Sequence, residues 1–139
     1  QRDQSQTNRA LEQLQMFIED FPESKMVQSA EESISQLRMK LAKKDYEIGR
    51  LYLKLEEYES ALIYFRSVLN QYYDTNLADK ARIGIVFTHI LNQNSQGAEN
   101  YLEAEKNNFL IVENYHEAEL LLSDTKEGLK LIHYYQLYK

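Results

Sequence analysis

The chain has 139 residues, which is enough for one domain with a buried core and short for two. Its formal net charge of −6 argues against a general nucleic-acid binder, and the lack of cysteine excludes disulfides and thiolate metal sites. Only four Gly and one Pro interrupt a composition rich in helix formers, so the expected fold is all-α, and no apolar run approaches the roughly 18 residues of a membrane span.

The first predicted helix begins after Ser5 or Thr7 and ends at Asp20. Its apolar residues recur at helical spacing: Leu11, Leu14, Phe17, Ile18 and Phe21. Pro22 ends this helix because proline lacks the N–H and collides with the preceding turn. Ser24 is then placed to cap the next helix.

Residues 25–55 contain no proline and a single glycine, Gly49, while their apolar residues keep a helical period. This pattern predicts one long helix, which at about 1.5 Å per residue would span roughly 46 Å. A break near residues 43–45 is the alternative, because the predicted helix is longer than is usual in globular proteins.

Shorter elements follow this long helix. A turn at residues 56–59 leads to predicted helices at 60–71, 77–91 and 98–107, with a polar, turn-rich loop at 92–97. One or two C-terminal helices are expected, because Asn114 and Asp124 are each followed three residues later by Glu. Residues 109–112 fit either a helix or a short extended segment, since four apolar residues do not decide a period.

Two stretches of the chain share an order of residue types: ALEQLQMFIEDFPES at 10–24 and EYESALIYFRSVLNQYYDT at 57–75. Counted from Ala42, the residues Gly49, Tyr52, Ala61 and Phe65 have the spacing of a 34-residue tetratricopeptide (TPR) repeat, although Tyr73 stands where proline is usual. We therefore predict a TPR-like solenoid of helical hairpins. Small Gly49 and Ala61 would let two helices approach while Tyr52 and Phe65 fill the space beside them.

A narrower resemblance lies in three segments: ALEQLQMFIEDFPES, SISQLRMKLAKKDYEIGRLYLKLEEYESALIYFRSVLNQYYDT and KARIGIVFTHILNQNSQGAEN. Together with RDQ near the start, they resemble the C-terminal half of the BamD family, the lipoproteins of the outer-membrane β-barrel assembly (BAM) machinery. Residues 37–54 carry most of the specificity. The resemblance covers roughly residues 2–109, so we expect TPR-like repeats at 1–109 and a C-terminal extension at 110–139 that packs on the last repeat.

The resemblance implies a non-catalytic periplasmic scaffold without a cofactor. Such a protein would be tethered to the inner leaflet of the outer membrane by an N-terminal lipid anchor that is not in this segment. Its C-terminal repeats would bind a POTRA domain of BamA and would also meet accessory BAM lipoproteins. The sequence also fits a segment cut from a longer array of repeats, since residues 10–22 match the second helix of a hairpin.

No arrangement of residues predicts catalysis or a metal site. His89, His116 and His133 lie far apart, and the chain has no HExxH motif, nucleophile elbow or phosphate-binding glycine loop. His89 stands where repeats carry Tyr, which favours a packed side chain.

The candidate partner-binding residues fall on two predicted helices: Lys43, Tyr46, Arg50, Lys54, Tyr64 and Arg66. The first four share or border one helix face with Glu47, and would form a locally basic, aromatic-edged groove for an acidic or extended partner segment. The alternative is a solvated face with Lys43–Glu47 and Glu47–Arg50 pairs. Tyr64 and Arg66 would point away from the Ala61–Phe65 seam, and such exposed residues are enriched at interface hot spots.

The chain closes on Tyr134, Tyr135 and Tyr138, which could cap the last apolar face of the solenoid or form an exposed partner site. Three other functions remain open. They are a different periplasmic TPR module that coordinates envelope growth or division, a cytosolic TPR adaptor for acidic peptide tails, and the helical part of an enzyme. The adaptor would need a denser basic groove, and the enzyme would need a catalytic domain outside this segment.

Overall fold

The structure is a computed structural model that describes residues 2–126. Six helices and no strand are found in that range, which confirms the all-α prediction. The helices are α1 (Arg2–Asp20), α2 (Val27–Lys54), α3 (Tyr58–Gln71), α4 (Ala78–Leu91), α5 (Ser95–Glu105) and α6 (Val112–Lys126). The closing tyrosines at 134–138 and His133 lie outside the described residues.

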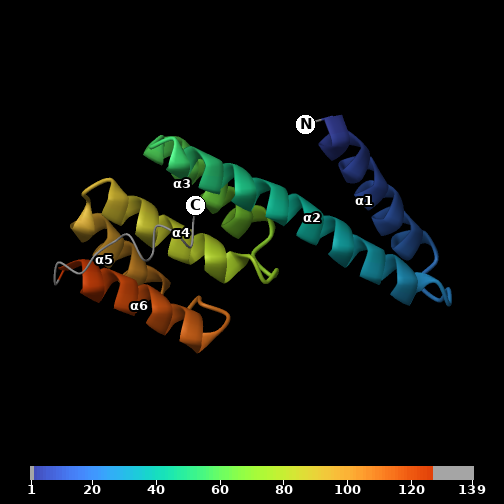
Figure 1. The fold of residues 1–139 in the computed structure, drawn as a ribbon. Coiled ribbons are helices and arrows are strands. Elements are labelled where there is room, and N and C mark those ends of the chain that lie inside the picture. The colour runs from blue at the N-terminus through green and yellow to red at the C-terminus, as the bar shows by residue number, and fades with distance from the viewer. Residues whose placement is uncertain (1, 127–139) are drawn as a thin grey trace.

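Consecutive helices pack against one another, and α2 and α6 both also contact α4 (Figure 1). This arrangement of stacked helical hairpins is the predicted TPR-like architecture. The N-terminal half of α2 projects beyond the body formed by α3 to α6, and α1 packs along this projecting half (Figure 1). The molecule therefore has an arm, α1 with the start of α2, and a body.

Helix α2 is a single helix of 28 residues, about 42 Å long, and the alternative break near residues 43–45 does not occur. Before it, Ser24 Oγ accepts a hydrogen bond from the Met26 N–H at 3.1 Å, so Ser24 supports the turn and the helix begins three residues later. At its other end Glu56 adopts a left-handed φ of 60°, which stops the helix and begins the tight turn into α3.

Helix α4 is the centre of the body. Nearly every residue from Ala78 to Ile90 is buried, because α2, α3, α5 and α6 all contact it. Such a helix has little amphipathic pattern, which is typical of a helix surrounded by others. The sequence reflects this in the continuous run IGIVF at residues 83–87.

The packing of α2, α3 and α4 centres on Phe65, which is fully buried. A Cβ atom added at Gly49 of α2 would lie 2.7 Å from Phe65 Cε1, and one added at Gly84 of α4 would lie 3.0 Å from Phe65 Cζ. Two glycines on two helices thus accommodate one ring. Gly49 has the predicted role. Tyr52 packs against the edge of the core, where it is partly buried and stacks on Tyr64 with ring centroids 5.6 Å apart.

The predicted C-terminal helix exists as α6, which packs against α4 and α5, but its start differs from the prediction. The helix begins at Val112, and Phe109 to Ile111 form the loop before it. Asn114 therefore lies in the first turn and does not cap it. Its side chain is instead drawn inward by a hydrogen bond to Asp79 of α4.

We predict that Gly49→Ala lowers the free energy of unfolding by about 1–3 kcal/mol, because the added methyl group would overpack against Phe65. Chemical denaturation at neutral pH measures this change. Ser29→Ala at an exposed position of α2 is the control, with an expected change of a few tenths of a kcal/mol.

A double-mutant cycle with Phe65→Leu tests the cause. The smaller side chain should relieve the overpacking, so the two changes together should cost less than the sum of their separate costs. Additive costs would show that the methyl group acts elsewhere than on the Phe65 ring.

Candidate functional site

A cavity of about 360 Å³ lies between α2 and the start of α4. Its wall on α2 includes Lys43, Glu47 and Arg50, its wall on α4 includes Lys80, and Tyr46 and Leu77 contribute aromatic and apolar surface. We name this cavity the α2–α4 groove. The spacing of three, four and seven residues along α2 explains why these side chains share one side of the helix.

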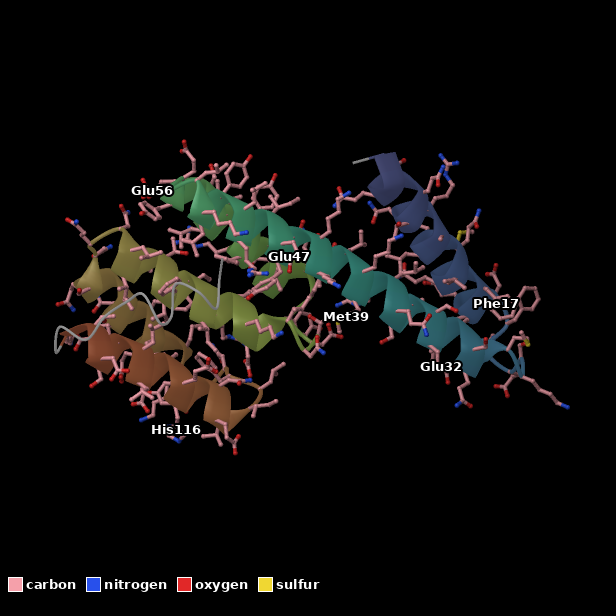
Figure 2. All side chains as sticks on the ribbon, viewed as in Figure 1. Phe17, Glu32, Met39, Glu47, Glu56 and His116 are labelled. Carbon is pink, nitrogen blue, oxygen red and sulfur yellow. The ribbon has the colours of Figure 1, made fainter. Side chains whose placement is uncertain are left out.

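The groove continues along the arm. A second cavity of about 340 Å³ shares Met39 and Asn76 with the first and extends along α2 as far as Glu31. Figure 2 labels Met39 and Glu47 on the stretch of α2 that passes the start of α4. The two cavities therefore lie next to each other along α2.

Charge is uneven along the groove. Arg50 Nη1 bonds to Glu47 Oε2 at 3.3 Å, which is the predicted pair across one helical turn. Lys43 and Lys80 are exposed, and neither has an ion pair within the described part of the chain. A chain with a net charge of −6 thus places two lysines from two different helices around one cavity, and residues 2–126 supply neither with an ion pair.

Tyr46 lies at the bottom of the groove with only 8% of its surface exposed. Its ring packs on Phe65 at 5.7 Å between centroids. Burial raises the pKa of Tyr46 to about 12, with Arg50 opposing the shift and Glu47 and Glu117 adding to it. The phenol therefore stays uncharged at neutral pH, and Tyr46 acts as core and groove floor more than as an exposed contact.

The other predicted residues lie elsewhere. Lys54 is exposed at the last position of α2 and does not border the cavity. Tyr64 is partly buried and stacks on Tyr52. Tyr52 is two positions from Arg50 on α2, so the side chain of Tyr52 points to the opposite side of the helix from Arg50. Arg66 is exposed on α3. The structure thus brings together Lys43, Tyr46 and Arg50, and separates them from Tyr64 and Arg66; whether any of the six contacts a partner stays a prediction.

Arg38 fastens the turn between α3 and α4 to α2. Its guanidinium donates a hydrogen bond to the Gln71 carbonyl at 3.1 Å, pairs with Asp74 and lies 5.6 Å from the centroid of the Tyr72 ring. The hydrogen bond from Arg38 is the main reason that the pKa of Asp74 is lowered. Since this turn precedes α4, Arg38 positions the second cavity and the start of α4 relative to α2.

Asp79 fixes the other side of the start of α4. Its carboxylate is 2% exposed and accepts bonds of 2.9 Å from the backbone N–H groups of Leu110 and Ile111, from Asn114 Nδ2 and from Arg82 Nη1. Burial raises the pKa of Asp79, but these hydrogen bonds outweigh it and the net pKa is lowered. The same turn of α4 thus anchors the loop before α6 with Asp79 and offers Lys80 to the groove.

Two of the three histidines lie in the described part of the chain, His89 on α4 and His116 on α6. Burial, with Arg66 adding to it, lowers the pKa of His89, so this histidine is packed and neutral at neutral pH. His116 is exposed on α6 and pairs only locally with Glu119 (Figure 2). Within residues 2–126, no group of three or more His, Asp or Glu side chains is placed to hold a metal ion, and no helix has the length and apolarity for crossing a bilayer.

Comparison with known families relates the chain to a family of envelope proteins. The family model YfiO, described as an outer membrane lipoprotein, matches residues 1–89. The chain belongs to the YfiO family. A search of curated proteins found no match to it.

The family match covers 89 of the 139 residues, including α1 to α3 and most of α4. All six predicted partner-binding residues and Lys80 lie inside it, whereas α5 and α6 lie beyond it. The matched part of the chain therefore contains the residues of both walls of the α2–α4 groove. The match confirms the predicted resemblance as far as residue 89.

Sequence reasoning missed the wall of the groove that belongs to α4. Lys80 and Leu77 carry no local pattern that points to binding, since their place depends on how α4 crosses α2. It also missed Asp79, although an aspartate within the first turn of a long apolar helix is a signal of capping or a buried polar contact.

We predict that Asp79→Asn lowers the free energy of unfolding by about 2–4 kcal/mol at neutral pH. The substitution removes a buried carboxylate that pairs with Arg82 and accepts bonds from the Leu110 and Ile111 N–H groups, while Arg82 keeps its bond to Glu105. A carboxylate with a lowered pKa stabilises the fold above its unfolded pKa, and this contribution is lost as pH falls through the folded value. The free energy of unfolding of the wild type, measured by urea denaturation, should therefore decrease as the pH is lowered beyond about 4. In the Asp79→Asn variant this decrease should be smaller, because the variant has no carboxyl group at this position to protonate.

Asp74→Asn is the matched control, because Asp74 also has a lowered pKa but is exposed. Loss of its surface pair with Arg38 should cost less than about 1 kcal/mol. Equal costs for the two substitutions would contradict the role given to the buried carboxylate.

Proposed function

We propose that this chain is a non-catalytic, protein-binding scaffold of the β-barrel assembly machinery of the outer membrane. In this function it binds a POTRA domain of BamA and supports the folding and insertion of outer-membrane proteins. The observation that carries the proposal is the YfiO family match over residues 1–89, which contains α1 to α3, most of α4 and the residues that line the groove.

The shape of the molecule supports binding as its mode of action. Stacked hairpins offer a large, rigid surface of the kind that repeat proteins use to bind partners. The groove joins an apolar and aromatic floor to charged walls, a combination that suits polypeptide recognition.

The description of the family as outer membrane lipoproteins supports a place in the cell envelope. We propose attachment to the periplasmic side of the outer membrane through a lipid anchor outside this segment, with accessory lipoproteins of the machinery as further partners. The alternative is a periplasmic TPR module that coordinates envelope growth or division. Binding to purified POTRA domains separates the two.

The test is a pull-down and affinity measurement with the cognate BamA POTRA domains, using the chain and its Arg50→Ala and Tyr64→Ala variants. Arg50 lines the groove, whereas Tyr64 of α3 stacks on Tyr52 at the other side of α2, so the two variants test two separate surfaces. We expect the wild-type chain to bind and at least one variant to bind about tenfold more weakly, equivalent to about 1.4 kcal/mol.

Arg9→Ala and Tyr73→Ala are the matched controls, since both residues are exposed and lie outside the groove and the Tyr52–Tyr64 stack. They should bind as the wild type does. A wild-type chain that binds no POTRA domain would overturn the placement of the interface on this segment.

A further inference from the structure

The α2–α4 groove and its continuation have the dimensions of a site for an extended peptide. The two cavities share Met39 and Asn76 and together follow α2 from Glu31 to Arg50. The helical rise from Glu31 to Arg50 corresponds to about 29 Å, which an extended chain of about nine residues would span.

The groove has a basic end and an acidic end. Lys43 and Lys80 face it at the end near Arg50 and have no ion pair within the described residues. At the arm end the only cation in the wall, Arg38, is occupied by Asp74, and Glu31 lies beside them. Carboxylates in a ligand would therefore be attracted to one end only.

Between the charges the groove offers apolar surface. Tyr46 and Leu77 are each 8% exposed, and Met39 packs against the core, so these side chains form a fixed floor. An extended peptide alternates its side chains between two faces. One face would place apolar side chains on this floor while the other directs carboxylates toward Lys43 and Lys80.

We propose that this groove binds an extended polypeptide segment with alternating apolar and acidic side chains, whose carboxylates contact Lys43 and Lys80. The proposal deepens the proposed function, and it rests on that function only in taking the chain to be a protein-binding scaffold. In this proposal Lys80 of α4 and Lys43 of α2 together make the groove selective for negatively charged partners.

A polypeptide fits these observations better than an anionic membrane or a nucleic acid. The two lysines stand on facing helices around a concave cavity, whereas a lipid surface is flat. The net charge of −6 also repels extended anionic surfaces, so only a ligand whose negative charge is confined to the groove gains from these two lysines.

The test measures fluorescence anisotropy of a labelled nonapeptide of alternating Leu and Glu against the whole chain. Matched nonapeptides carry Gln or Lys in place of Glu. We expect the Glu peptide to bind, with an affinity that falls as the salt concentration rises. The Gln and Lys peptides should bind at least tenfold more weakly than the Glu peptide. Equal binding of the Glu and Gln peptides would overturn the proposal.

Charge reversal tests the two lysines. Lys43→Glu and Lys80→Glu should each lower the affinity for the Glu peptide at least tenfold. The double variant should bind the Lys peptide more tightly than the Glu peptide. Lys126→Glu, which makes the same charge change on α6 outside the groove, should leave binding unchanged. Circular dichroism confirms that each variant is folded, and an unchanged peptide preference in the double variant would overturn the proposal.

Two further results are informative. If vesicles of phosphatidylglycerol bind the chain in a manner that depends on Lys43 and Lys80, and the Glu peptide does not bind, a lipid surface replaces the peptide as the ligand. If the POTRA domains bind normally while the Glu peptide does not, the groove proposal fails and the scaffold function stands. If the Glu peptide binds while the POTRA domains do not, the proposed POTRA partner is wrong and the groove proposal stands.

Discussion

The structure depends on one ring held between two glycines. Phe65 of α3 lies against Gly49 of α2 and Gly84 of α4 so closely that a methyl group at either glycine would meet it. Protein interiors are packed densely enough that such a fit fixes the distance between helices. Since α2 and α4 are also the two walls of the groove, the same ring sets the width of the surface that we propose for binding.

The first turns of α4 join stability to recognition. Asp79 faces the interior and holds the loop before α6, while its neighbour Lys80 faces the groove and Leu77 contributes to the floor. From the opposite side, Arg38 fastens the preceding turn to α2. A binding wall that is anchored in this way loses little conformational entropy when a partner arrives, which favours affinity.

Much of the fold could be predicted from the sequence because its determinants are local. Helical periodicity, the breaker Pro22 and the spacing of Gly49 and Phe65 predicted the long helix and the central hairpin. Only the α2 side of the groove could be predicted from the sequence. Lys43 and Arg50 share a helix face that a period reveals, whereas Lys80 and the burial of Tyr46 depend on contacts between helices that no single period encodes.

The unbroken course of α2 has a mechanical meaning. Its first half carries α1 and its second half forms a wall of the groove, and no hinge residue interrupts the helix between them (Figure 1). Helix α1 therefore acts on the same helix that forms a wall of the groove, and its residues Gln4 and Thr7 border a cavity together with Lys43 and Glu47 of that wall. The position of the arm and the width of the groove are thus coupled through one continuous hydrogen-bonded backbone.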